Sequence, residues 1–286
     1  MNVARLAGAL PARPFSIQSD VSRTALFAAA GVLAALNAEA DQIISAVQYE
    51  RVGLVIGTLA GVSAVVWFAM YAALTIGFEA PVGRLRRGDA LVLSAILVLA
   101  VVPLLYAAKA ALLLAALHLF FTPQPGHSDR RVACVLLALT GPLIWGRLIL
   151  LALASPLLSL DAHIVGRLIG SPVDGNTVQF SGSRIQFLVG TGCSSLHNMS
   201  LAIVLWTTAI ALFNLRLSWR LLVIGVAMVL WMFALNILRL ASIGLFPVRF
   251  VFLHEGVGAE LFGWGSLLGA AALIAFGVID ASRRQQ

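Results

Sequence analysis

The chain has 286 residues, of which 60% are hydrophobic and 11% are charged, and its mean hydropathy is +0.98. A soluble domain carries about 25% charged residues, so this composition excludes most soluble enzymes and indicates a membrane protein with several spanning helices. The net charge of +7 is explained by arginines in short cytoplasmic loops and needs no nucleic-acid partner. Two cysteines are too few for a disulfide framework.

Apolar runs predict where the chain crosses the bilayer. The runs cover about 24–45, 52–77, 90–121, 132–158, 194–213, 218–244 and 259–280. One crossing needs about 20 residues, and the run 90–121 is long for one span and short for two, so we interpret it as a tight helical pair. The expected fold is therefore an all-α polytopic membrane protein with about eight transmembrane helices.

The expected domain organisation is a single integral membrane domain over 1–286. A helical N-terminal half covers 24–158 and a C-terminal half covers 193–280, and the longest polar insert, 161–192, separates them. The polar segment 1–22 is followed by an apolar run without a convincing cleavage site. That run is therefore expected to be a retained helix and not a removed signal peptide.

Arginine clusters set the expected orientation, because arginine gathers in cytoplasmic loops. The clusters lie at 84–87, 129–131, 216–220 and 282–284. Eight spans with both termini inside place all of them in the cytoplasm. Glu39, Asp41, Glu50 and the insert 161–192 then lie on the opposite, extracytoplasmic side, with the insert before the sixth helix.

The insert carries a weak strand signal. Its apolar residues alternate with polar residues on either side of a Ser-Gly-Ser turn, which predicts a small β-hairpin. These apolar residues are Val178, Phe180, Ile185, Phe187 and Val189.

Cys193 is the candidate nucleophile. It follows Gly190-Thr191-Gly192 where the insert enters a helix, and the positive end of a helix dipole favours a thiolate. Packing is the competing interpretation. Ser194 could add a hydrogen bond at the site or simply cap the helix. Cys134 lies in an apolar run and is interpreted as a core residue.

Arg239 and His254 are expected at the same external surface as Cys193. Arg239 lies late in the 218–244 run, where a charge is costly unless it snorkels to the interface or has a function. Asn236, at i−3, could hold the guanidinium on the same helix face. His254 precedes the last span, and His197, four residues after Cys193, is the alternative base.

Cysteine, histidine and arginine together suit acyl transfer through a thioester. The thiolate attacks a carbonyl, histidine moves the proton, and arginine stabilises negative charge. No Asp or Glu lies between Gly175 and His254, and Glu255 is expected to point away from the histidine. The sequence predicts neither a metal site nor a cofactor.

Two further arginines are candidates for substrate binding. Arg147 lies near the middle of the 132–158 run, where a substrate carboxylate, a lipid headgroup or backbone carbonyls could be its partner. Arg184 lies in the external insert and could meet an acidic motif, although solvated loop arginines are common.

At these residues the sequence resembles the exosortase/archaeosortase family of membrane transpeptidases. The resemblance covers about 160–280 and rests on three blocks in order. The blocks are Gly192-Cys193-Ser194, Asn236-Ile237-Leu238-Arg239, and Phe252-Leu253-His254-Glu255 followed by Gly263-Trp264. One departure is Ser195, where the family usually has glycine after Cys-Ser.

The resemblance implies an activity, a location and a partner. The family cleaves a C-terminal sorting signal, often a Pro-Glu-Pro motif (PEP-CTERM) followed by a transmembrane helix and a basic end. Its nucleophile, arginine and histidine fall on Cys193, Arg239 and His254. The expected place is the bacterial inner membrane, with an extracytoplasmic active site, a tailed protein substrate and an unknown acceptor.

Two functions of other classes compete with this interpretation. In a small-molecule or lipid transporter, Arg147, Lys109 and Arg239 would line a path for an anion. In a non-catalytic membrane scaffold, Cys193 would be inert.

Overall fold

The computed structural model describes residues 22–49, 59–83, 85–102, 104, 106–124, 126 and 128–285. The expectations for the segment 1–21, for Glu50 and for the beginning of the 52–77 run lie outside these residues. Arg84 of the first arginine cluster lies outside them too.

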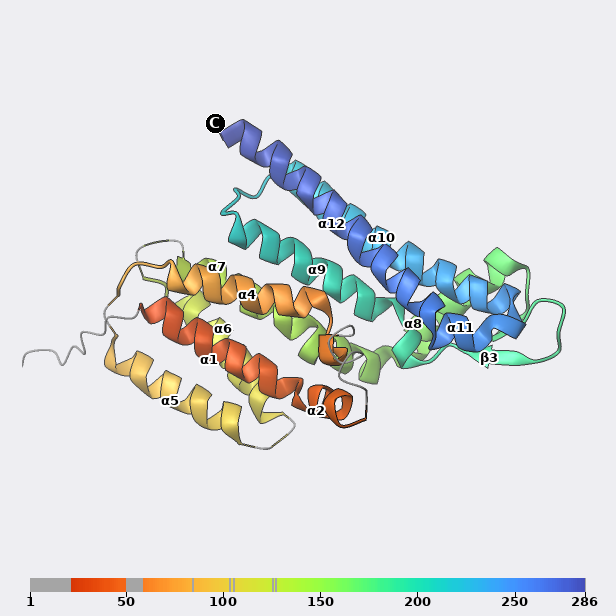
Figure 1. Ribbon diagram of the computed structural model, residues 1–286, viewed down its shortest axis with the longest axis horizontal. Helices are drawn as coiled ribbons and strands as arrows, with labels where there is room; N and C mark the ends of the chain where they lie inside the picture. The colour runs from red at the N-terminus through yellow and green to blue at the C-terminus, as the bar shows by residue number, and fades with distance from the viewer. Residues whose placement is uncertain are drawn as a thin grey trace, which may run out of the picture.

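Helices make up the first half of the chain (Figure 1). They are α1 (Arg23–Ala38), α2 (Ala40–Tyr49), the 3₁₀ turn η1 (Leu59–Gly61), α4 (Ala64–Phe78), α5 (Arg87–Val101), α6 (Ala107–Phe121) and α7 (Ser128–Thr140). Local signals set the ends of α1: Ser22 caps it by accepting from the Ala25 amide, and the chain bends by 54° between α1 and α2. The predicted helical pair at 90–121 is confirmed as α5 and α6.

The second half contains the longer helices. They are the π-helical turn η2 (Gly141–Trp145), α8 (Gly146–Ile169), the 3₁₀ turn η3 (Thr191–Cys193), α9 (Ser195–Leu212), α10 (Trp219–Leu245), the 3₁₀ turn η4 (Pro247–Arg249), α11 (Phe250–His254) and α12 (Val257–Gln285). The predicted spans at 194–213, 218–244 and 259–280 correspond to α9, α10 and α12. Figure 1 shows α9, α10 and α12 running side by side, and both α9 and α12 pack against α10.

Within the described residues, four helical segments are long and apolar enough to cross a membrane by length and composition. They are Ser128–Ile169, Ser195–Leu212, Trp219–Leu245 and Val257–Arg284, with the bent pair α1–α2 as a fifth if it counts as one span. The predicted number of eight is therefore not supported, since the described part of the chain contains four or five such segments. The helices α4, α5 and α6 have 15 residues each, or about 22 Å at 1.5 Å per residue, against about 30 Å of hydrocarbon.

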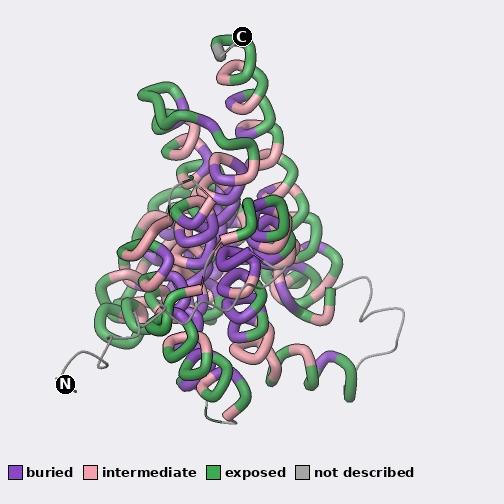
Figure 2. Tube along the Cα trace, turned by 90° about the vertical axis from the view of Figure 1, so that its left-hand side faces the viewer, coloured by how far each residue is buried: buried purple, intermediate pink, exposed green. Residues whose placement is uncertain are grey.

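Exposed apolar faces support a membrane environment for the long helices. In the apolar windows of α10 and α12, only 28% and 22% of the residues are buried inside the protein. Their exposed side chains include Leu230, Leu238, Leu261 and Phe276. Figure 2 shows the buried residues gathered in the middle of the bundle, while the C-terminal part of α12 projects from it with little cover. A soluble monomer rarely exposes so much apolar surface, so these helices indicate a membrane protein.

The segment from α7 to α8 corrects the predicted boundary of the insert. The helix continues to Ile169, so the first residues of 161–192 are helical and the irregular part begins at Gly170. Gly170 has a φ of 67°, the left-handed conformation with which many helices end. Pro156 lies inside α8 and Leu153 departs from helical geometry, because proline blocks a helical hydrogen bond in the turn before it.

A small antiparallel sheet follows α8, with strand order β1-β2-β3. The strands are β1 (Val173–Asp174), β2 (Thr177–Gln179) and β3 (Gln186–Leu188). The predicted hairpin is confirmed as β2 and β3, with Val178 opposite Phe187, and β1 adds a third strand. The predicted apolar face is buried except at Ile185, which is 68% exposed.

Buried charges join several helices at the opposite end of the bundle. The Arg23 guanidinium lies 2.9 Å from Asp89 and 2.5 Å from Asp129, and all three side chains are buried. Burial opposes ionisation of Asp89, but hydrogen bonds from Arg23 and His118 outweigh it and lower the pKa of Asp89, so this carboxylate is ionised at neutral pH. Arg131 donates to the last carbonyls of α9, Ala211 and Leu212, and so ties that helix end to α7.

The apolar interior consists of two clusters. The larger lies among α1, α4, α5, α6, α7, α9, α10 and α12. The smaller lies at the end with the sheet and contains Leu158 and Val165 of α8, Phe187 of β3, Leu240 of α10 and Cys193. We call it the outer core, and it surrounds the candidate site.

Candidate functional site around Cys193

Cys193 and His254 lie side by side in the fold. The Cys193 sulfur is 3.4 Å from Nε2 of His254, although 61 residues separate them in the sequence. Cys193 ends η3 immediately before α9, and His254 ends the short helix α11. Figure 1 shows α11 and the sheet together at one end of the molecule, away from the C-terminus of α12. The distance allows a direct thiol–imidazole hydrogen bond.

The His254 ring is held on two sides. It stacks on Phe250, with centroids 5.0 Å apart and planes at 11°, and its Nδ1 lies 3.2 Å from a carboxylate oxygen of Glu255. The expectation that Glu255 points away from the histidine is therefore wrong. A proton on Nδ1 facing Glu255 leaves Nε2 free to accept the thiol proton. Glu255 is 75% exposed, so water screens its charge.

Asn236 holds the backbone at Cys193. Its side-chain amide donates to the Cys193 carbonyl at 2.8 Å and to the Ser195 hydroxyl at 3.1 Å, and its oxygen accepts from Asn198 at 3.4 Å. Asn236 was expected to hold Arg239, and this is corrected: its hydrogen bonds go to α9 and to the turn before it. Helical spacing indicated which face of α10 carries Asn236, but it could not indicate which residues of the neighbouring helix Asn236 binds.

Asp161 is a site residue that the sequence reasoning missed. Its carboxylate accepts from the Ser195 backbone amide at 3.0 Å, and only 4% of the residue is exposed. The apolar run 132–158 ends before Asp161, so the sequence predicts that Asp161 belongs to the external insert. The signal in the sequence is Gly170, since a glycine commonly follows the last turn of a helix and this one lies beyond Asp161.

Arg239 lies on α10 between Ile237 and Leu240, two members of the outer core. Its Nε is buried and has no hydrogen-bond partner among the described residues. No hydrogen bond or ion pair within these residues joins it to Cys193 or His254. Arg239 therefore has a buried, unpaired donor one helical turn after Asn236, the residue that binds the Cys193 carbonyl.

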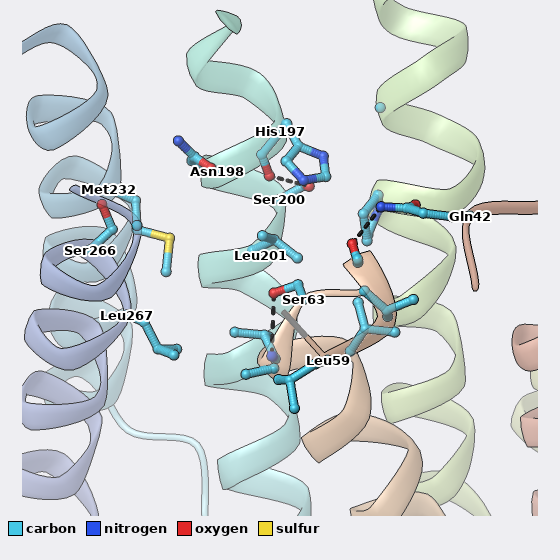
Figure 3. A pocket seen from close by; sticks show the side chains of 18 of the residues that line it. Gln42, Leu59, Ser63, His197, Asn198, Ser200, Leu201, Met232, Ser266 and Leu267 are labelled. Atoms are coloured by element: carbon cyan, nitrogen blue, oxygen red, sulfur yellow. Dashed lines mark hydrogen bonds between the residues drawn. The ribbon is translucent and has the colours of Figure 1, made fainter. Parts of the chain in front are cut away.

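His197 and Arg147 line a different feature, a cavity of about 650 Å³ between the two halves of the chain (Figure 3). Figure 3 shows His197, Asn198 and Ser200 of α9 facing this cavity, across from the segment that carries Leu59 and Ser63. His197 makes no side-chain hydrogen bond within the described residues, so Cys193 is paired with His254 and not with the alternative base.

The cavity has mixed chemistry. Glu39 and Glu260 lie in its lining with Arg147, and apolar side chains such as Leu201 and Leu267 cover the rest. Arg147 forms no ion pair within the described residues, although it lies in the long segment Ser128–Ile169. The volume is within the range of small-molecule pockets, about 300–1,000 Å³.

The remaining candidates have simpler surroundings. Ser194 caps α9 by accepting from the Leu196 amide, and Arg184 is exposed in the turn between β2 and β3. Lys109 is 4% exposed in the first turn of α6 and lies over the Tyr106 ring. Cys134 is half-buried and unbridged on α7.

Comparison with protein-family models, with curated proteins and with solved structures gives no match.

Proposed function

We propose that this chain is a cysteine-dependent membrane transpeptidase or protease of the exosortase type, which cleaves C-terminal sorting signals of exported proteins. The observation that carries the proposal is the 3.4 Å contact between the Cys193 sulfur and Nε2 of His254. Sequence blocks far apart in the chain are brought together by the fold into the pair that thioester chemistry needs.

The reaction would begin with proton transfer from Cys193 to Nε2 of His254 as the sulfur attacks the substrate carbonyl carbon. Arg239 would stabilise the negative charge that develops on the carbonyl oxygen, since its buried Nε has no other partner. The carbon–nitrogen bond then breaks, and the leaving amine takes the proton from His254. A thioester remains on Cys193; an acceptor amine or water then attacks its carbonyl carbon, gives a proton to the neutral His254, and the carbon–sulfur bond breaks to release the thiolate.

The proposed setting is the bacterial inner membrane, with the Cys193 end of the bundle extracytoplasmic. The arginine clusters support this direction, because those at 129–131 and 216–220 lie at the beginnings of α7 and α10, at the end of the bundle away from the sheet (Figure 1). The partner is a protein with a C-terminal sorting tail, whose helix enters laterally from the bilayer. Arg147 in the cavity and Arg184 near the sheet are the proposed contacts for its polar groups.

The test is processing of a reporter protein that carries a Pro-Glu-Pro motif, a membrane-spanning helix and a basic end. It is co-expressed with the wild-type chain or with Cys193→Ala, His254→Ala or Arg239→Ala, at matched membrane levels. We expect Cys193→Ala and His254→Ala to abolish cleavage, because they remove the nucleophile and the proton acceptor, and Arg239→Ala to reduce it strongly, because it removes a donor to the oxyanion.

Two variants serve as controls, because they remove the same types of side chain at positions outside the proposed pair. Cys134→Ala removes the other thiol, and His197→Ala removes the other histidine of the site region, and both are expected to process the reporter. Cleavage by correctly inserted Cys193→Ala would contradict the proposal.

The cavity is the one observation that favours a transporter. Of the three basic residues expected to line an anion path, only Arg147 lines this cavity; Lys109 is buried over Tyr106, and Arg239 is half-buried on α10, outside the cavity lining. A continuous basic path is therefore not formed by these three residues, and the enzyme proposal accounts for more of the site.

A further inference from the structure

Asp161 is a buried charge that the proposed reaction does not use. Its carboxylate, 4% exposed, lies within α8 and accepts from the backbone amide of Ser195, the first residue of α9. It also interacts with the Ser195 side chain. Burying a carboxylate costs free energy unless it is hydrogen-bonded. A role in holding the backbone of α9 would explain why the protein keeps a carboxylate at this buried position.

The carboxylate is placed where the helix can bind it. The first amides of a helix have no partner within the helix and carry its positive end. At α9, Asp161 takes the Ser195 amide and Ser194 takes the Leu196 amide. The start of α9 is therefore fixed by a side chain from another helix.

We call residues 193–195 the cysteine turn, and two helices hold it from two sides. Asp161 of α8 holds the amide two residues after Cys193, and Asn236 of α10 holds the carbonyl of Cys193 itself. Asn236 also donates to the Ser195 hydroxyl, so both anchors meet at Ser195. With the backbone held on each side, the Cys193 side chain has little freedom to leave the His254 ring.

We infer that Asp161 is a positioning residue for the nucleophile, acting through its hydrogen bond to the Ser195 amide. It fixes the turn 193–195 so that the Cys193 sulfur stays within reach of His254. The inference rests on the proposed function for its biological meaning, but the geometry can be tested without any substrate.

The test is the rate at which iodoacetamide alkylates Cys193 in membranes, in a Cys134→Ala background that leaves one thiol. An isolated thiol is protonated and slow at mildly acidic pH, whereas a thiol beside an imidazole keeps some thiolate there. The readout is the ratio of the rate at mildly acidic pH to that at alkaline pH. His254→Ala sets the value for an unpaired thiol. The other charged groups near the pair, Arg239 and Glu255, stay unchanged.

We expect Asp161→Ala to lower this ratio by about tenfold, towards the value of His254→Ala, as loss of a hydrogen bond to a charged group implies. Asp161→Asn keeps an acceptor oxygen and is expected to stay within about threefold of the wild type. Asp174→Asn, the same change at an exposed carboxylate in β1, is the matched control and should leave the ratio unchanged.

A second pair of variants removes the donor instead of the acceptor. Ser195→Pro deletes the amide at the first helical position, where proline is tolerated, and Ser194 already has the extended conformation that precedes proline. Ser195→Ala keeps the amide. We expect the proline variant to behave like Asp161→Ala and the alanine variant to keep most of the wild-type ratio.

The inference is overturned if inserted Asp161→Ala and Ser195→Pro keep the wild-type ratio while His254→Ala lowers it. It is overturned as well if Asp161→Asn falls as far as Asp161→Ala, or if His254→Ala leaves the ratio unchanged. If the ratios change as expected but the reporter is never cleaved, the positioning role stands and the proposed function fails.

Discussion

Two arginines lie in apolar surroundings at opposite ends of this bundle, and their partners differ. The terminal nitrogens of Arg23 bind Asp89 and Asp129, and the residue is 2% exposed. Arg239 has a buried Nε without a partner and no ion pair among the described residues. Both arginines have a buried Nε without a hydrogen-bond partner among the described residues, so the difference between them is the ion pairs. Arg23 joins helices through its two ion pairs, whereas the charge of Arg239 is left for another molecule, which is the condition for a role in chemistry.

The largest expected effect on stability is at the ion-paired arginine, Arg23. Arg23→Ala leaves two buried carboxylates without a cation, which costs about 3–5 kcal/mol. Unfolding of the purified protein in detergent, followed by heat or denaturant, measures it. Arg220→Ala is the control, since Arg220 is 61% exposed, 3.6 Å from Asp280, and its loss should cost at most about 1 kcal/mol. Equal losses in both variants would remove the proposed distinction.

The unpaired arginine is expected to show the opposite pattern. Arg239→Ala should reduce reporter cleavage by about 10²–10³-fold, the effect of losing one donor to a developing oxyanion, while the unfolding transition stays near the wild type. Arg239→Lys keeps the charge without the guanidinium fork and should recover part of the rate. Arg220→Ala, at the other end of α10, should cleave normally. Wild-type cleavage by Arg239→Ala would refute its role.

A smaller effect is expected at Asn236, whose bonds join the outer core to the cysteine turn. Asn236→Ala leaves the Cys193 carbonyl without its side-chain donor, which should cost about 1–3 kcal/mol of unfolding free energy. Asn198→Ala, which removes only the 3.4 Å contact to Asn236, should cost less than about 1 kcal/mol. If the two variants unfold alike, Asn236 does not anchor the turn.

The smallest effect is expected at Glu255. Because this carboxylate is 75% exposed, Glu255→Gln should change the cleavage rate by no more than about fivefold. The single-turnover rate of the reporter measures this, with His254→Ala as the reference for complete loss. A loss as large as that of His254→Ala would make Glu255 a required third member of the site.

The sequence indicated the membrane class and much of the helix layout. Long apolar runs predicted α9, α10, α12 and the pair α5–α6, because hydrophobic length is a local property. It did not give the number of spans. An apolar run in the sequence can be longer than the helix it contains. The helices α4 and α6 have only 15 residues each, which is too short to cross the bilayer.

The sequence also predicted the candidate pair, Cys193 and His254. Cys193 follows glycines at a helix start and His254 precedes the last span, and the arginine rule placed both on one side of the membrane. Only the tertiary structure decided between His254 and His197, because helical spacing puts His197 near Cys193 and no local pattern reports on a contact 61 residues away.

The sequence by itself therefore determined which parts could form the site. These are the apolar helices, one thiol at a helix start, and arginine clusters that predict which helix ends are cytoplasmic. The partners were decided by the tertiary structure. Asp161 binds Ser195 and Asn236 binds Cys193 because α8, α9 and α10 pack together around the outer core. Hydrogen bonds between helices depend on which faces meet, and periodicity along one helix specifies the face but not its neighbour.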